Sequence, residues 1–371
     1  MPLLGVSGAV IGGAYVPGDV SIDDGVIDRV GLPPGRGGLA TPGFVDLQVN
    51  GFAGVDFLSA NRDQWQEAER HLARTGVTEY VANMISSAPD QTSRALAQAR
   101  GVWGESQAGG ARLAGVHVEG PFLAPPRAGI HPSAHLAQPD KAQLVQWVES
   151  GPIVMMTLAP ELPGATELIA ALRGEGIVVS LGHSEATYEE AMEGFDAGAT
   201  TITHLFNAMS GISAREPGLA GAALSRPDVW LQLIIDLMHV DPVLVKLVAS
   251  HAPERIVAVT DCLSVTGTDL THLRFADSDI EVVDGRAVNA EGVLAGSVLQ
   301  MDQALRHAVS CGMSTVDAVN ATTRNPLAVL NRPTQSLLAP GSVADVVVLS
   351  DSLDVQTVLL AGVDTRMQEV C

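Results

Sequence analysis

This chain of 371 residues has few cysteines and no block of basic residues. Its three cysteines, Cys262, Cys311 and Cys371, are odd in number and far apart, which argues against a disulfide framework and favours a reducing compartment. No basic segment precedes an apolar stretch at the start, and no apolar run is long enough to span a bilayer. We therefore expect a cytoplasmic protein that has no membrane partner.

Positive charge is also scarce. The chain has 21 Lys and Arg residues against 42 Asp and Glu residues, a formal net charge of -21. Nucleic acid is therefore excluded as a partner, because phosphate backbones are bound by a positive surface. A small anionic substrate would also be repelled at long range, so a few local arginines would have to hold it.

Aliphatic residues are plentiful, since apolar residues make up 46% of the chain and aromatic residues only 4%. This composition suits buried parallel strands. Strand-like runs alternate with amphipathic runs, which indicates βαβ units, and eight such units favour a closed (β/α)8 TIM-like barrel. The expected strands are Phe44–Val49, Val77–Ala82, Leu113–Val118, Ile153–Leu158, Ile177–Leu181, Thr200–Thr203, Trp230–Ile235 and Ile256–Val259. The expected helices between them are Asp63–Arg74, Asp90–Val102, Pro139–Glu149, Ala165–Arg173, Ala186–Asp196 and Asp241–Ala249.

The two ends of the chain differ from this pattern. Short alternating runs separated by Gly-rich turns are typical of β structure, and Asp284-Gly285 is typical of a hairpin turn. We expect residues 1–40 and 335–371 to form one small β-sandwich-like domain, with the barrel at 41–334.

Polar residues stand where several of the apolar runs end. Glu119, His183, His204 and Asp261 each follow an expected strand. The carboxyl ends of barrel strands meet at one mouth, where catalytic residues collect. Two imidazoles and one carboxylate match the three protein ligands of a catalytic metal site, which leaves one position for water. The sequence predicts that Glu119, His183 and His204 bind one divalent metal, with Zn as the first choice and Fe, Co or Mn as alternatives.

Asp261 ends an otherwise apolar strand, where a carboxylate is costly to bury unless it is paired or functional. Beside a metal site it could accept a proton from the nucleophile and return it to a leaving amine. A helix cap or a structural salt bridge is the alternative. Gln48 and Asn50 end the first strand, and because amides are poor ligands for transition metals, they favour a single metal and hydrogen bonding to substrate or solvent.

Other candidates lie in loops. The Asn207-Ala208 backbone and Arg215 could hold an anion, since arginine offers paired donors to phosphate. His131 and His239 could each donate a hydrogen bond in the mouth, although a lone histidine is more often structural. Leu294–Ser297 could present main-chain groups to a ligand.

At these residues the chain resembles a known family. The segments PGFVDLQVNG, GVHVEGPFL, LGHSEAT, THLFNAM, REPGLAG, VTDC and LAGSVLQMD occur in the order seen in the N-acetylglucosamine-6-phosphate deacetylases of the amidohydrolase superfamily. The resemblance extends from about Thr41 to GSVADVVVL, almost the whole chain. It implies hydrolysis of the acetamide of N-acetylglucosamine 6-phosphate to glucosamine 6-phosphate and acetate.

The resemblance also implies residue roles. Glu119, His183 and His204 are similar to the metal ligands, Asp261 to the general base and acid, and His131 to the residue that polarises the acetyl carbonyl. Arg215 resembles an arginine that reaches the phosphate of a neighbouring subunit, which implies a homodimer or homotetramer. The expected contacts to the sugar and phosphate are Ile130, Asn207, Ala208, His239, Leu294, Ala295, Gly296 and Gln48.

One departure concerns Leu237, which stands where the family often has glycine and could shift His239. Two other functions remain open. One is a barrel amidohydrolase that acts on a different amide, cyclic imide or N-acyl substrate. The other is a non-catalytic barrel that senses amino sugars.

Overall fold

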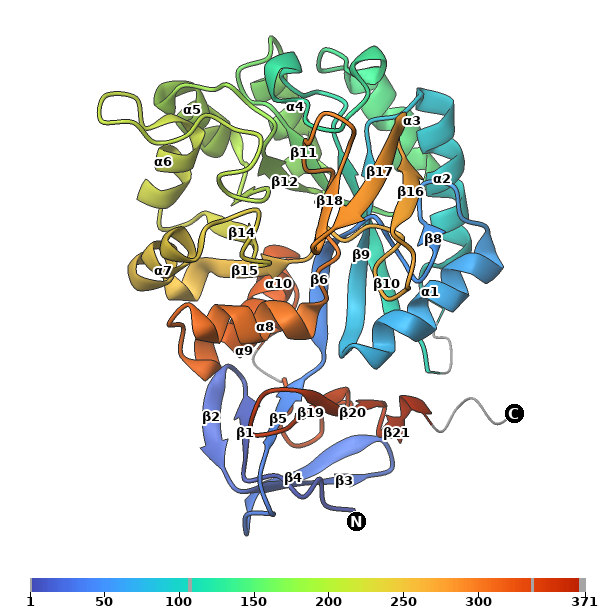
Figure 1. Ribbon diagram of the computed structural model, residues 1–371, viewed down its shortest axis with the longest axis vertical. Coiled ribbons are helices and arrows are strands. Elements are labelled where there is room, and N and C mark those ends of the chain that lie inside the picture. The colour runs from blue at the N-terminus through green and yellow to red at the C-terminus, as the bar shows by residue number, and fades with distance from the viewer. Residues whose placement is uncertain (1, 106–108, 335–336, 367–371) are drawn as a thin grey trace.

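The computed structural model describes residues 2–105, 109–334 and 337–366. Eight parallel strands form one sheet in the order β15-β14-β13-β12-β11-β10-β9-β6 (Figure 1). All eight overlap the expected strands, so the predicted fold class is confirmed. The strands are β6 (Phe44–Val49), β9 (Val77–Ile85), β10 (Arg112–Glu119), β11 (Ile153–Leu158), β12 (Val178–Leu181), β13 (Thr201–Ile202), β14 (Trp230–Ile234) and β15 (Ile256–Val259).

The first and last strands of this sheet meet at the mouth and nearly close the barrel. The Asp261 N–H donates to the Gln48 carbonyl at 2.9 Å, and Val49 forms a parallel bridge with Cys262. Cys262 and Cys311 are buried free thiols, whereas Cys371 lies outside the described residues. The closure brings the end of the first strand against the end of the last.

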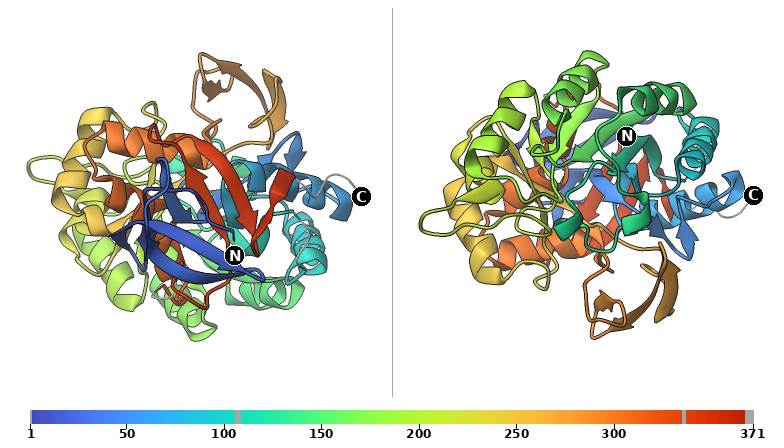
Figure 2. Two further views of the ribbon diagram at one scale, coloured as in Figure 1. Left: turned by 90° about the horizontal axis from the view of Figure 1, so that it is seen from below. Right: turned by 90° about the horizontal axis from the view of Figure 1, so that it is seen from above.

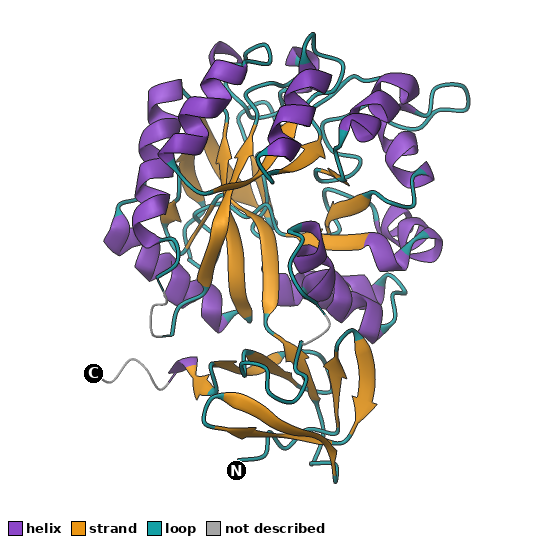
Figure 3. Cartoon of the chain, turned by 180° about the vertical axis from the view of Figure 1, so that it is seen from behind, coloured by secondary structure: helices purple, strands orange, loops and turns teal. Residues whose placement is uncertain are grey.

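Helices surround the barrel sheet (Figure 3). The six helices expected between the barrel strands are present, and α6 (Gly218–Ser225) is a further helix between β13 and β14. Most of its residues are buried, and its sequence, GLAGAALS, has no polar face that would mark an amphipathic helix. The others are α1 (Arg62–Arg74), α2 (Pro89–Val102), α3 (Lys141–Ser150), α4 (Ala165–Gly174), α5 (Tyr188–Ala197), α7 (Pro242–His251), α8 (Met301–Ser310), α9 (Thr315–Thr322) and α10 (Arg324–Val329). No helix among the described residues is both long and apolar enough to cross a bilayer.

Strands from both ends of the chain form a separate β unit below the barrel (Figure 1). Its larger sheet has the order β2-β1-β5-β19-β20-β21, and β3 pairs with β4 in a hairpin. The domain limits that we expected from the sequence stay a prediction. The strands are β1 (Gly8–Ile11), β2 (Ala14–Pro17), β3 (Asp19–Asp23), β4 (Val26–Leu32), β5 (Leu39–Pro42), β19 (Val346–Leu349), β20 (Val355–Leu360) and β21 (Val363–Asp364).

A small antiparallel sheet follows the last barrel strand. It consists of β16 (His272–Phe275), β17 (Ser278–Val283) and β18 (Arg286–Val288), and the expected turn at Asp284-Gly285 joins the last two. We call this sheet the flap; it projects from the side of the barrel (Figure 2). A further short hairpin, β7 (Gly51–Phe52) with β8 (Val55–Asp56), follows the first barrel strand.

Candidate active site

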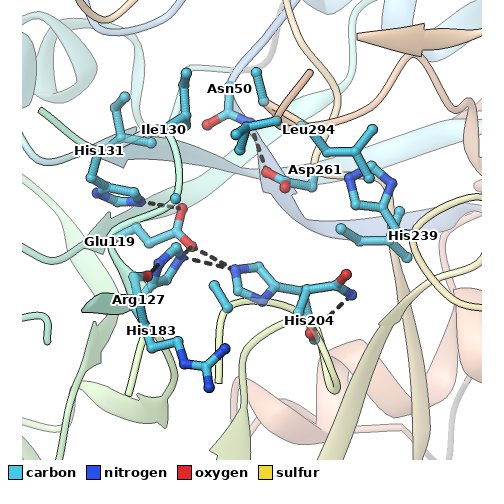
Figure 4. Close-up of a pocket in the computed structure, with 18 of the residues that line it drawn as sticks. Asn50, Glu119, Arg127, Ile130, His131, His183, His204, His239, Asp261 and Leu294 are labelled. Carbon is cyan, nitrogen blue, oxygen red and sulfur yellow. Dashed lines mark hydrogen bonds and ion pairs between the residues drawn. The ribbon is translucent and has the colours of Figure 1, made fainter. Parts of the chain in front are cut away.

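A cavity of about 420 Å³ opens at the mouth of the barrel (Figure 4). Its walls come from the loops that follow the strands and from the flap. The side chains expected to bind metal and move protons meet there, together with all the expected sugar and phosphate contacts except Gln48 and Arg215. The lining residues include Asn50, Glu119, Arg127, Ile130, His131, His183, His204, Asn207, Ala208, His239, Asp261, Phe275, Arg286, Leu294, Ala295 and Gly296.

The three expected metal ligands converge on one point from the ends of three strands (Figure 4). Glu119 Oε1 lies 3.2 Å from His183 Nε2 and 3.1 Å from His204 Nε2, and the two Nε2 atoms are 3.1 Å apart. All three residues are buried. Ligand atoms placed tetrahedrally around zinc are about 3.3 Å apart, given Zn–N bonds of about 2.0–2.1 Å. The group therefore matches the spacing of a metal site.

The hydrogen bonding of the rings shows that this group fits a cation. His183 Nδ1 lies 2.7 Å from the Arg127 carbonyl oxygen, which can only accept, so the ring N–H is on Nδ1. In the neutral ring, Nε2 therefore presents a lone pair to His204 and to the Glu119 carboxylate. His183 Nε2 and the Glu119 carboxylate are then two acceptors that face each other, and they repel unless a proton or a metal lies between them.

The charges in the group agree with this. Burial alone would raise the pKa of Glu119, but the close contacts of its carboxylate with the ring nitrogens of His183 and His204 hold that pKa well below its usual value. Burial would lower the pKa of His204, but Glu119 raises it through a hydrogen bond and its charge. The carboxylate is therefore ionised and is available as a metal ligand.

Asp261 faces the same cavity from the end of the last strand. Its Oδ1 accepts hydrogen bonds from Asn50 Nδ2 at 2.8 Å and from Gln48 Nε2 at 3.2 Å. Its Oδ2 has no hydrogen bond to any residue that the structure describes. Burial and the nearby charge of Glu119 raise the pKa of Asp261 to about 6. Asp261 can therefore accept and release a proton near neutral pH.

His131 is held as a neutral hydrogen-bond donor. The Ser86 backbone N–H donates to His131 Nδ1 at 3.2 Å, so the ring proton is on Nε2. Nε2 lies 3.9 Å from Glu119 Oε2, beside the metal-ligand group. Burial and the neighbouring His183 lower the pKa of His131 to about 3. The ring is thus suited to donate to a carbonyl oxygen.

Several of these residues have backbone torsions that L-amino acids seldom adopt. The φ angles are +49° at His183, +34° at His204 and +51° at Asp261. A residue in this left-handed region costs of order 1–3 kcal/mol, and such strain gathers at functional sites. The strand ends are therefore shaped by the site rather than by local backbone preference.

A network of amides supports the carboxylates, and Asn83 is the member that the sequence analysis missed. Its Nδ2 donates to Glu119 Oε2 at 2.6 Å and to Asn50 Oδ1 at 2.8 Å. Gln48 donates to Glu119 Oε1 at 3.2 Å and is fully buried. Asn83 follows Val77–Ala82 directly, so the rule that found Glu119, polar residues at strand ends, could have found it too.

The expected contacts to the sugar divide into two groups. Gln48 is not among the lining residues, and its amide is used by Glu119 and Asp261, so direct substrate contact by Gln48 stays a prediction. Arg215 is exposed and does not line the cavity of its own subunit. The other expected contacts to the sugar and phosphate line the cavity: Ile130, Asn207, Ala208, His239, Leu294, Ala295 and Gly296.

His239 has an ion-pair partner, Asp236, that the sequence analysis did not identify. His239 Nδ1 lies 2.6 Å from Asp236 Oδ2, and the backbone N–H of His239 donates to Asp236 Oδ1 at 2.8 Å. Burial opposes ionisation of Asp236, but the hydrogen bond from His239 lowers its pKa below the usual value. Asp236 thus fixes the ring and leaves Nε2 directed away from the pair. Like Asn83, it directly follows an expected strand.

Comparison with known proteins places this site in a family. The model of the amidohydrolase family matches residues 39–363. The N-acetylgalactosamine-6-phosphate deacetylase of Escherichia coli O157:H7 is 33% identical over 328 residues, which cover 87% of each chain. The N-acetylglucosamine-6-phosphate deacetylase of Rattus norvegicus is 34% identical over 342 residues, which cover 88% of this chain and 83% of the relative.

A solved structure agrees over the whole molecule. A mutant of N-acetyl-D-glucosamine-6-phosphate deacetylase from Mycobacterium smegmatis, in complex with N-acetyl-D-glucosamine-6-phosphate, has a TM-score of 0.90. It is 34% identical, and the match covers 98% of both chains. The resemblance inferred from the sequence motifs is thereby confirmed, and the chain belongs to the amidohydrolase family, together with the N-acetylglucosamine-6-phosphate deacetylases.

Proposed function

We propose that this chain hydrolyses the acetamide of N-acetyl-D-glucosamine 6-phosphate to D-glucosamine 6-phosphate and acetate. One observation carries the proposal: the Glu119, His183 and His204 group and an Asp261 carboxylate with one uncommitted oxygen face the same cavity. The relatives named above carry this activity or its galactosamine counterpart in their names.

The group would hold one divalent cation per subunit. Zinc is our first choice, and iron, cobalt or manganese also suit imidazole and carboxylate ligands. When bound, such a cation makes water more acidic and polarises a carbonyl group. The bond of His183 Nδ1 to the Arg127 carbonyl turns Nε2 toward the cation position, and Glu119 is ionised, as metal binding needs.

The chain's own residues then carry the proton. Asp261 Oδ2 accepts a proton from the attacking water while the water oxygen bonds to the acetyl carbon. His131 Nε2–H donates to the acetyl oxygen as negative charge develops on it. The carbon–nitrogen bond breaks when Asp261 returns the proton to the amine nitrogen. The raised pKa of Asp261 suits both directions of this transfer.

The sugar would lie between the loop walls, and its phosphate would face the Asn207-Ala208 backbone and His239. Arg215, exposed and outside its own cavity, would reach the phosphate of a neighbouring subunit. The protein would then be a homodimer or homotetramer. With its buried free thiols Cys262 and Cys311, it would act in the reducing cytoplasm.

A second substrate has support of its own. The Escherichia coli O157:H7 relative, at 33% identity, is named for the galactosamine epimer. N-acetyl-D-galactosamine 6-phosphate differs only at the C4 hydroxyl, which leaves the acetamide and the phosphate unchanged. Both epimers therefore have to be assayed.

The deciding experiment measures acetate release from both phosphorylated epimers and from plain N-acetylglucosamine, with metal analysis of the same preparation. We expect turnover of a phosphorylated sugar, about one bound metal per subunit, and loss of activity with a chelator that is restored by added metal. Equal rates on plain and phosphorylated sugars would favour an amidohydrolase for a different N-acyl substrate. Binding without any acetate release would favour a sensor.

A further inference from the structure

The flap forms one wall of the cavity and is fixed to the barrel. Phe275 and Ala287 of the flap pack in an apolar cluster with Leu263 and Ala295 of the barrel side. The Ala295 N–H donates to the Ala287 carbonyl at 3.0 Å. The backbone next to Ala287 is therefore held in place, and Arg286 is the residue that precedes it.

Arg286 lines the cavity on the side of the loop that carries His239. A methyl group placed on the neighbouring Gly285 would lie 3.2 Å from the Met238 Cε atom. Met238 precedes His239, which lines the same cavity. The flap turn therefore lies against the loop that carries His239, on the side where the proposed function places the phosphate.

The charges around the cavity leave Arg286 available. Glu119 and Asp261 make the interior acidic, and the lining arginines among the described residues are Arg127 and Arg286. Arg127 forms an ion pair with Glu185. For Arg286 the described part of the chain offers no side-chain hydrogen bond or ion pair. Among the described residues that line the cavity, Arg286 is therefore an arginine whose guanidinium is available to a phosphate dianion.

We propose that Arg286 binds the phosphate of the substrate from within the same subunit and thereby selects phosphorylated sugars. This inference rests on the proposed function. It differs from the role of Arg215, because Arg215 would act across a subunit contact. The chain has a net charge of -21, so it repels the anionic sugar phosphate. A cation inside the cavity lowers the electrostatic cost of binding this phosphate. The planar guanidinium suits paired hydrogen bonds to phosphate oxygens.

The test compares Arg286→Met and Arg286→Lys with Arg274→Met as a matched control. Arg274 lies on β16 of the same flap, its side chain is 69% exposed, and it does not line the cavity. For Arg286→Met we expect KM for the phosphorylated sugar to rise roughly tenfold, as for loss of one charge-assisted hydrogen bond. The kcat value and the rate with plain N-acetylglucosamine should stay within about twofold. Arg286→Lys should recover part of the loss, and Arg274→Met should match the wild type.

Two results would overturn the inference. One is an unchanged ratio of kcat/KM for phosphorylated over plain sugar in Arg286→Met, and the other is an equal loss on both substrates. If the wild type deacetylates no sugar, the proposed function fails instead. Calorimetry with inorganic phosphate then still tests Arg286, because weaker binding by Arg286→Met than by Arg274→Met supports a phosphate contact, whereas equal binding contradicts it.

Discussion

The two ends of the barrel use polar residues for different purposes. At the mouth, polar groups such as Asp261 and His204 have unusual φ angles and shifted pKa values. At the opposite end, Glu79 at the start of β9 forms ion pairs with Arg112 and Arg332, and Arg112 lies 2.7 Å from Asp345 of the β unit. Each of these four charged side chains forms an ion pair with one of opposite sign.

The bottom of the barrel contributes to stability, and the mouth carries the chemistry. Paired charges at the bottom join the barrel to the terminal strands, as expected for the stabilising end of such a barrel. The mouth instead holds the Glu119, His183 and His204 group, whose ligand atoms lie within 4.8 Å of one another, and the Asp261 carboxylate, whose Oδ2 has no hydrogen bond to a described residue. We therefore expect substitutions at the mouth to change rates and substitutions elsewhere to change stability.

The largest effect should come from Asp261→Asn. The amide cannot accept the proton of water, so we expect kcat to fall about 10⁴-fold. Metal content and melting temperature should stay near the wild-type values, because Asn50 and Gln48 can still bond to the remaining carbonyl oxygen. Steady-state kinetics with metal analysis checks this, and Asp277→Asn on the flap is the control. A variant with a near-normal rate would remove Asp261 from the mechanism.

A smaller loss should follow His131→Ala. Removal of a donor to the developing oxyanion costs about 10²–10³ in kcat. Ser86→Ala is the comparison variant: it removes the 2.9 Å contact of the Ser86 hydroxyl with His131 Nδ1, while the backbone N–H still donates to Nδ1 and keeps the ring proton on Nε2. We expect less than about fivefold change in that variant. Equal losses in both would contradict the role of Nε2–H as the donor to the oxyanion, because Ser86→Ala retains that donor.

The stability of the fold should depend on pH through Glu69, a buried residue of helix α1 on the outside of the barrel. Burial raises the pKa of Glu69 from 4.5 to about 7, although Tyr80 donates a hydrogen bond to it. Between these values the folded protein holds a proton that the unfolded chain has lost, so stability falls as pH rises. This group should account for about 3 kcal/mol of that fall.

Glu69→Gln should remove this pH dependence, because its amide stays neutral and can still accept from Tyr80. Urea unfolding at pH 5 and pH 8 measures the difference. We expect the variant to be more stable than the wild type at pH 8, with unchanged kcat/KM. An identical pH slope in both proteins would contradict the assignment.

At the bottom of the barrel, Glu79→Gln should destabilise the fold by about 2 kcal/mol, since it leaves Arg112 and Arg332 without their shared carboxylate. The kcat/KM value should stay within about twofold. Chemical unfolding and kinetics on the same preparation check both parts. A large loss of rate with normal stability would break the division between the two ends.

The smallest effect concerns Leu237, whose φ is +65°. Glycine accepts this torsion without steric cost, whereas alanine does not. Leu237→Gly should therefore be more stable than Leu237→Ala by about 1 kcal/mol. Comparing these two variants cancels the loss of the side chain. Equal stability would mean that the loop relaxes, and His239 would then be less firmly held than the structure indicates.

The barrel and the central residues of the site could be predicted from the residue pattern alone. Apolar runs that are buried on both faces fix parallel strands, and polar residues that end such runs must lie at the mouth, as Glu119, His183, His204 and Asp261 do. Helix α6 escaped prediction because a helix buried nearly all round has no polar face to mark it.

Which polar side chains form hydrogen bonds with one another depends on the tertiary structure. The bonds of Asn83 to Glu119, of Gln48 to Asp261 and of Asp236 to His239 depend on the closure of the barrel and on loop torsions. Arg286 lies 25 residues beyond Asp261 in the chain and reaches the cavity because the flap packs on Leu263 and Ala295. Periodicity assigns a side chain to a face, whereas distances between elements are set by how those faces pack together.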